Sequence, residues 1–170
     1  GVVGKSPSAA ALNEQLAQYV WLLISQFPVV PTIIGGDFNL NPHEHAVWKR
    51  ILESYLQYCY RALNLVGDYD CYLIKNRKKF GIETTASCLF NEKKIIIYCE
   101  ERLVADVLRS IAHEATHLRQ FEMGLTPDEK YLHFSSELED GANELAGKLL
   151  NAFSEVMGYD TIYGDRVATI

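Results

Sequence analysis

The chain has 170 residues, of which 48% are hydrophobic and 22% are charged. This length is enough for one domain with a sizeable core, and the composition excludes an intrinsically disordered chain. Sixteen Lys and Arg residues against 22 Asp and Glu residues give a formal net charge of −6. An acidic chain without a basic cluster is poorly suited to bind nucleic acid, and the apolar runs are too short for a transmembrane helix. We therefore expect a soluble, cytoplasmic protein that binds neither nucleic acid nor a membrane.

The amino-terminal 65 residues are predicted to be mainly helical. Ser6-Pro7 is typical of a helix start, and apolar residues follow at helical spacing as far as Phe27. The short apolar run 32–34 is predicted to be a strand or a buried connector. Asn41-Pro42 is a second helix start, and this helix is expected to end near Arg61.

The middle of the chain has the pattern of β-strands. Segments 68–75, 83–90 and 94–99 are rich in Tyr, Ile, Thr and Cys and nearly alternate between apolar and polar residues. The turn residues 91–93 separate the last two segments. A small antiparallel sheet is therefore expected. The four cysteines are too few and too far apart for a disulfide scaffold or a thiolate zinc site, and we predict buried free thiols at Cys59, Cys71, Cys88 and Cys99.

Two long helices are predicted to follow the strands. The first extends from about Leu103 to Met123, with Gly124 as its stop, and the second extends from Ser136 to about Met157. A short helix is expected between them from Thr126, and residues 158–170 have no clear pattern. The predicted fold is α+β, in a single domain over residues 1–170. It has a helical part over about 1–65, a catalytic core over 66–157 and a tail over 158–170.

The sequence His113-Glu114-Ala115-Thr116-His117 is an HExxH motif on the first of these long helices. Residues four apart lie on one helical face, so both imidazoles can reach one metal ion. Glu114 is placed to take a proton from a water molecule at that metal. An apolar stripe predicts that the core lies on the opposite side of the helix, and it consists of Val104, Leu108, Ile111, Ala115 and Leu118. The alternative is a solvated polar face, which would also include Arg102, Asp106, Arg109 and Gln120.

A catalytic zinc ion needs a third protein ligand, and the sequence downstream offers several. The candidates are His133, Glu137, Glu139 and Glu144. Glu139 is preferred because it lies on the inward, apolar side of the last helix, where a carboxylate needs a partner or a metal. Its alternative role is a capping box with Ser136. Asn143, one turn later, is placed to hydrogen-bond to a metal ligand.

HExxH followed by residues 139–143, Glu-Asp-Gly-Ala-Asn, resembles the gluzincin zinc peptidases, in which a second helix supplies a Glu ligand. The resemblance covers roughly residues 95–157. It implies that His113, His117 and Glu139 bind Zn²⁺ and that Glu114 is the general base. It also implies a peptide or protein substrate, which would bind along an edge strand formed by residues 94–99. Tyr131 and His133 are candidates for a residue that stabilises the transition state.

Three other motifs suggest different functions. The segment from Thr32 to Pro42, which contains Gly-Gly-Asp-Phe-Asn at 35–39, resembles the endonuclease/exonuclease/phosphatase family, but an upstream Glu strand and a Ser-Asp-His sequence are missing. Residues 1–6 imitate the end of a phosphate-binding loop without its preceding strand and first Gly. His43 and His45 lie two positions apart at a helix start, where the rings point apart, and a surface cluster is expected.

These patterns together predict a zinc-dependent metallopeptidase. A nuclease-family fragment is the weaker enzymatic alternative. A second hypothesis is a non-catalytic binding protein or virion-structural protein that retains the same fold. The intact Glu114 argues against this second hypothesis, because a protein without turnover has no need of a general base.

Overall fold

The computed structural model of the chain describes residues 33–35, 42–125 and 134–164. Several expected features lie outside these residues: the helix over 7–27, the start of the chain, most of the Gly-Gly-Asp-Phe-Asn segment, the short helix from Thr126, and the side chains of Tyr131 and His133. The side chains of His43 and His45 are also outside the description. Within the described ranges, no helix has the length and apolar character needed to cross a membrane.

Three long helices form the helical layer. They are α2 (Pro42–Ala62), α3 (Val104–Glu122) and α4 (Ser136–Met157), all within one or two residues of the expected bounds. Gly124 follows α3 with a φ of 79°, a left-handed conformation that suits Gly and ends the helix as expected. One expectation is corrected at the end of the chain. The patternless tail contains a short helix, α5 (Tyr159–Tyr163).

The sheet has four described strands: β1 (Ile33–Gly35), β2 (Asp70–Ile74), β3 (Ala86–Leu89) and β4 (Lys94–Tyr98). Their order is β1-β2-β4-β3, and a short 3₁₀ helix, η1 (Lys78–Phe80), lies between β2 and β3. The α+β class is confirmed, but the expected antiparallel sheet is correct only for the β3–β4 hairpin. Strands β1, β2 and β4 pair in parallel. Parallel neighbours need a long crossover, which α2 provides between β1 and β2.

The identity of the edge strand also differs from the expectation. Residues 94–98 form β4, which lies inside the sheet between β2 and β3. Among the described strands, β3 is the edge on this side. The sequence pattern of β4, with three consecutive Ile residues, fits this inner position because both faces of the strand are buried.

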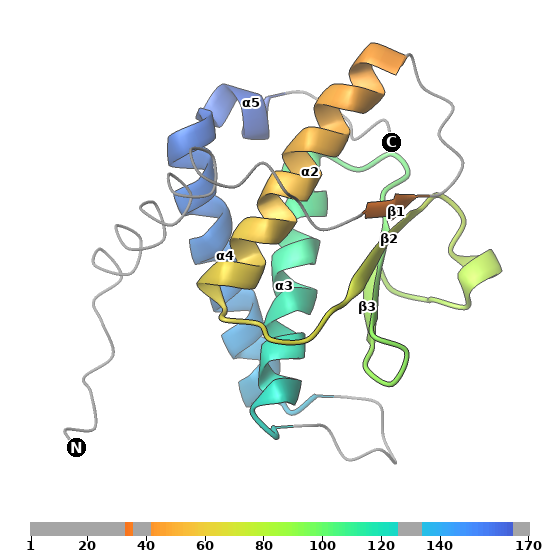
Figure 1. Cartoon of the computed structure of the whole chain (residues 1–170), viewed down its shortest axis with the longest axis vertical. Coiled ribbons are helices and arrows are strands. Elements are labelled where there is room, and N and C mark those ends of the chain that lie inside the picture. The colour runs from red at the N-terminus through yellow and green to blue at the C-terminus, as the bar shows by residue number, and fades with distance from the viewer. Residues whose placement is uncertain (1–32, 36–41, 126–133, 165–170) are drawn as a thin grey trace.

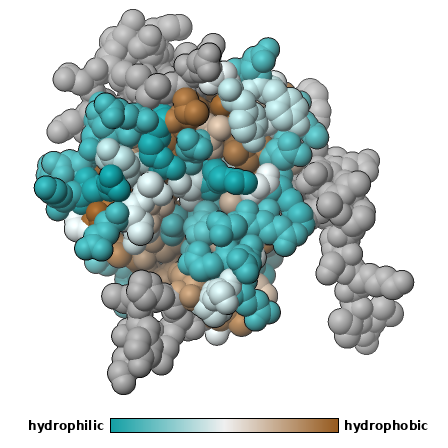
Figure 2. Space-filling view, turned by 180° about the vertical axis from the view of Figure 1, so that it is seen from behind, coloured by the Kyte–Doolittle hydropathy of each residue, from teal (hydrophilic) through white to brown (hydrophobic). Residues whose placement is uncertain are grey.

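Helix α3 is the centre of the fold, and Figure 1 shows it among α2, α4 and the sheet, with all three helices on one side of the sheet. The sheet face toward the helices is formed by alternate residues of β2 and β4, namely Cys71, Leu73, Ile95 and Ile97, all at most 2% exposed. They belong to one core with the predicted stripe of α3 and with Phe153 of α4. The opposite view in Figure 2 shows mostly hydrophilic residues with smaller hydrophobic areas between them.

The start of α4 is set by a different residue from the one predicted. The N-cap is Ser135, whose side chain accepts a hydrogen bond from the backbone N–H of Leu138. With Ser135 as the N-cap, the acidic partner of a capping box would have to be residue 138. Glu139 therefore does not complete the capping box that was predicted with Ser136. Its carboxylate remains available for another partner.

Candidate metal centre

His113 and His117 lie one turn apart on α3, and their side chains converge. The two Nε2 atoms are 3.0 Å apart, and the rings are nearly perpendicular with centroids 4.6 Å apart. His117 is only 2% exposed. The sequence predicted that both histidines lie on the side of α3 opposite to the core. This prediction is wrong for His117, which is buried because α4 packs against the side of α3 that faces away from the sheet.

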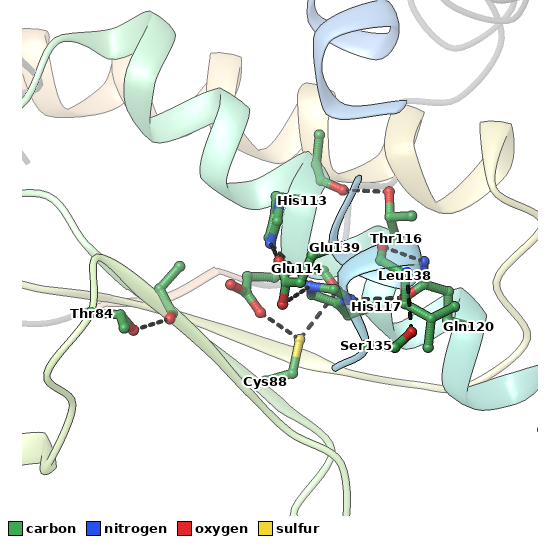
Figure 3. Close-up of polar contacts among 12 residues, drawn as sticks. Thr84, Cys88, His113, Glu114, Thr116, His117, Gln120, Ser135, Leu138 and Glu139 are labelled. Atoms are coloured by element: carbon green, nitrogen blue, oxygen red, sulfur yellow. Dashed lines mark hydrogen bonds and ion pairs between the residues drawn. The ribbon is translucent and has the colours of Figure 1, made fainter. Parts of the chain in front are cut away.

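Glu139 approaches the two imidazoles from the first turn of α4 (Figure 3). Its Oε2 is 3.3 Å from Nε2 of His113, and its Oε1 is 3.3 Å from Nε2 of His117. The ligand atoms of the three residues all lie within 4.8 Å of one another, and this is the one such group among the described residues. The structure thus brings together the three residues that the sequence selected.

The competing carboxylates lie elsewhere. Glu137 is exposed, and Glu144 is exposed and forms an ion pair with Lys148 one turn later on α4. His133 is outside the described residues. Of the predicted candidates that the structure describes, Glu139 is the one at the histidine pair.

Gln120 fixes the orientation of the His117 ring and its tautomer. The Gln120 side-chain N–H donates to the backbone oxygen of Leu138 at 3.0 Å, so its amide oxygen faces His117, 2.8 Å from Nδ1. An amide oxygen can only accept a hydrogen bond, and Nδ1 of His117 must therefore hold the proton. In the neutral ring, Nε2 then presents its lone pair to His113 and Glu139, as a metal ligand does.

His113 receives its support from Asn143, whose side chain hydrogen-bonds to it as the sequence suggested. Burial lowers the pKa of His113 below its ordinary value, and the neighbouring His117 lowers it further. The interactions with Glu139 and Asn143 oppose this shift but do not reverse it. At neutral pH His113 is thus an uncharged imidazole that can donate a lone pair.

Glu114 lies on the same helix but faces β3, and it is 7% exposed. Burial raises its pKa to about 7, while a hydrogen bond with the thiol of Cys88 lowers the pKa and the charge of Glu139 raises it. The Sγ–Oε2 distance is 2.9 Å. A carboxyl group with a pKa near neutrality can both accept and release a proton, which general acid–base chemistry requires.

Three aromatic contacts lie at or beside the site. Phe134 stacks on the His117 ring with centroids 3.7 Å apart and an interplanar angle of 11°. Phe90, which follows β3 directly, contacts Phe134 edge-on and stacks on Phe121 of α3. Phe134 therefore covers one face of the His117 ring, and Phe90 links Phe134 to Phe121 of α3.

The free edge of β3, meaning the edge that pairs with no other described strand, lies next to this group of side chains. Tyr98 N–H donates to Thr85 O, so Thr85 and Tyr98 form a hydrogen-bonded antiparallel pair. Such pairs alternate with non-hydrogen-bonded pairs. Ala86 and Cys88, opposite Ile97 and Ile95, belong to the second kind. Their backbone N–H and C=O groups therefore point toward the free edge, where an extended chain could pair with them.

Sequence reasoning identified His113, Glu114, His117, Glu139 and Asn143, but it missed Gln120, Cys88 and Phe134. Gln120 was named only within the alternative of a solvated face, although its spacing of three residues from His117 places it beside that ring. Cys88 and Phe134 are distant in sequence from the motif, and nothing in their local pattern links them to it. Comparison of the chain with protein-family models, with curated proteins and with solved structures finds no match.

Proposed function

We propose that this chain is a zinc-dependent peptidase of the gluzincin type, with His113, His117 and Glu139 as the metal ligands. The observation that supports this most directly is the convergence of three ligating atoms from two helices, with the lone pair of His117 directed into the group by Gln120. Two imidazoles and one carboxylate form a ligand set that catalytic zinc sites use, with one position left for water or substrate.

The distances between the ligand atoms suit a zinc ion. Two atoms that are each about 2.0–2.1 Å from zinc at the tetrahedral angle are about 3.3 Å apart. The two Nε2 atoms are 3.0 Å apart, and each lies 3.3 Å from a different oxygen of Glu139. A rotation of the Glu139 carboxylate that brings one oxygen toward both imidazoles would complete the ligand set.

When bound, zinc would polarise the carbonyl of a peptide bond and lower the pKa of a water molecule. Glu114 would accept a proton from the attacking water. As the water oxygen bonds to the carbonyl carbon and the C–N bond breaks, Glu114 would give that proton to the leaving amine nitrogen. The free edge of β3 would hold the substrate backbone by strand addition beside these residues.

The test combines metal analysis with hydrolysis. The purified chain should contain one zinc per molecule and should cleave fluorescein-labelled casein. Glu114→Gln keeps the size of the side chain but removes the base, so it should retain zinc and lose hydrolysis by roughly 10²–10⁴-fold. Glu144→Gln, an exposed carboxylate on α4, is the matched control and should cleave at the wild-type rate.

Each alternative has a distinct result. Undiminished cleavage by the Glu114→Gln variant would refute the role of Glu114. A chain that binds zinc but cleaves nothing would instead be the non-catalytic binding protein considered from the sequence. A buried carboxyl group with a pKa near 7 beside three ligand atoms favours the enzyme.

A further inference from the structure

Cys88 lies where the edge strand β3 passes α3, and two parts of this residue face the candidate site. Its Sγ is 2.9 Å from Oε2 of Glu114 and 3.1 Å from the backbone oxygen of the same residue (Figure 3). Its backbone N–H and C=O belong to the non-hydrogen-bonded pair with Ile95 and point toward the free edge. One residue therefore contacts both the proposed base and the place where a substrate strand would pair.

The chemical state of the sulfur decides what it can do. Burial raises the pKa of Cys88 well above its ordinary value, and the nearby charge of Glu114 raises it further. The sulfur is therefore a neutral thiol, whereas a nucleophile or a metal ligand has to be a thiolate. A thiol is a weak donor, and a carboxylate oxygen is its strongest neighbouring acceptor.

We propose that Cys88 is a positioning residue that holds Glu114 in the orientation needed for proton transfer. The thiol donates to Oε2, which leaves Oε1 for the attacking water. Because a peptide that pairs with the backbone of Cys88 would immobilise this residue, binding of the substrate strand would also steady the base. This inference rests on the proposed peptidase function.

The hydrogen bond can be tested without any measurement of activity. The S–H stretching band of Cys88 is assigned in infrared spectra of the metal-free protein, as the band that is present in the wild type and absent in Cys88→Ser. At a pH of about 9, where the wild-type Glu114 is charged and Cys88 is still a thiol, this band should lie at higher wavenumber in Glu114→Gln, because the charged acceptor becomes a neutral amide. Cys99 is the matched thiol, since it donates to Ile74 O at 3.2 Å in the core, and its band should not move. An unchanged Cys88 band would overturn the inference.

The positioning role requires kinetics with defined variants. A fluorescence-quenched peptide is chosen from sequences that the wild-type chain cleaves. Cys88→Ala should lower kcat about tenfold, with KM changed less than twofold and zinc content unchanged, because an oriented hydrogen bond to a charged group is lost. Cys88→Ser should recover most of kcat, since a hydroxyl can also donate. Cys99→Ala should have wild-type kcat and KM.

The outcomes separate this inference from the proposed function. An active wild-type chain with a fully active Cys88→Ala variant, or with Cys88→Ser as slow as Cys88→Ala, overturns the role of Cys88 alone. If Cys88→Ala does not fold by circular dichroism, the comparison of wild type with Cys88→Ser and the infrared shift decide the question. A wild-type chain that cleaves no peptide overturns the peptidase and the positioning role together.

Discussion

Gln120 connects the two helices of the site through the two ends of one amide. Its oxygen accepts from the ring of His117 on α3, and its nitrogen donates to Leu138 O, the residue before Glu139 on α4. Gln120 is 9% exposed, so neither end is readily replaced by water. The same side chain therefore selects the His117 tautomer and fixes the turn that carries Glu139.

Replacement of Gln120 should weaken zinc binding. Gln120→Leu keeps most of the side-chain volume but removes both hydrogen bonds, and we expect the affinity for zinc to fall about 10–100-fold. Gln120→Glu retains an acceptor for His117 and should lose less. The measurement is competition with a chelating dye. Equal affinities in the wild type and the Leu variant would mean that the contact with His117 has no effect on the metal.

The convergence of His113 and His117 was predictable from the sequence because a spacing of four residues on one helix determines it. The contact of Gln120 with His117 was not predicted, because helical periodicity assigns one buried face, whereas α3 is covered by the sheet on one side and by α4 on the other. Cys88 is brought to Glu114 by strand pairing, which a local pattern does not contain.

At the scale of elements, Glu122 ties the end of α3 to the segment that leads into β2. Its carboxylate accepts from Val66 N–H, from Gly67 N–H and from the hydroxyl of Tyr69, at 2.9, 2.9 and 3.0 Å. A Cβ atom at Gly67 would lie 2.5 Å from the Tyr69 ring, so this close approach requires Gly. These contacts align β2 with α3.

Glu122→Gln should destabilise the fold in a pH-dependent way. Burial alone would raise the pKa of Glu122, but the hydrogen bonds from Val66, Gly67 and Tyr69 and the charge of Arg119 outweigh burial and lower it. A lowered pKa in the folded state adds stability above the unfolded pKa of about 4.3, and this stability is lost as pH falls through the folded value. At pH 7 the variant should lose about 1–2 kcal/mol.

The measurement is urea unfolding of the metal-free protein at pH 7 and at pH 3. The difference between wild type and Glu122→Gln should be large at pH 7 and should shrink at pH 3, where the wild-type carboxyl group is increasingly protonated. Glu144→Gln is the control, because an exposed ion pair with Lys148 contributes little to stability. A difference that is the same at both pH values would contradict the assignment of the effect to charge.

Element bounds were predictable from the sequence, whereas element pairing was not. Caps, Gly stops and apolar periodicity placed α2, α3 and α4 closely. The strands β2, β3 and β4 also appeared where alternation predicted them. Alternation does not identify a neighbour, however, so the parallel β2–β4 pair and the edge position of β3 could not be deduced. Ser135 and Ser136 are equally good cap residues by type, and only the structure distinguishes them.

At the scale of the whole molecule, the candidate centre lies at the junction of all the layers. The two imidazoles belong to the central helix α3, the carboxylate belongs to α4, and the proposed base faces the edge of the sheet. A metal ion would therefore bridge α3 and α4, which no disulfide links among the described residues. Metal binding and the stability of the fold should be coupled as a consequence.

Zinc should raise the melting temperature of the wild-type chain, and a chelator should reverse the effect. A ligand that binds only the folded state stabilises it by about 2.7 kcal/mol when its free concentration is 100 times Kd. For a domain of this size, that corresponds to an increase of roughly 5–10 °C. His117→Ala lacks one proposed ligand, so its melting temperature should respond much less to zinc, whereas Glu144→Gln should respond like the wild type.

The measurement is thermal unfolding across a series of buffered free zinc concentrations. A wild-type melting temperature that is independent of zinc would mean that His113, His117 and Glu139 form a metal-free polar cluster between α3 and α4, since their mutual contacts would then satisfy the partly exposed carboxylate without a metal.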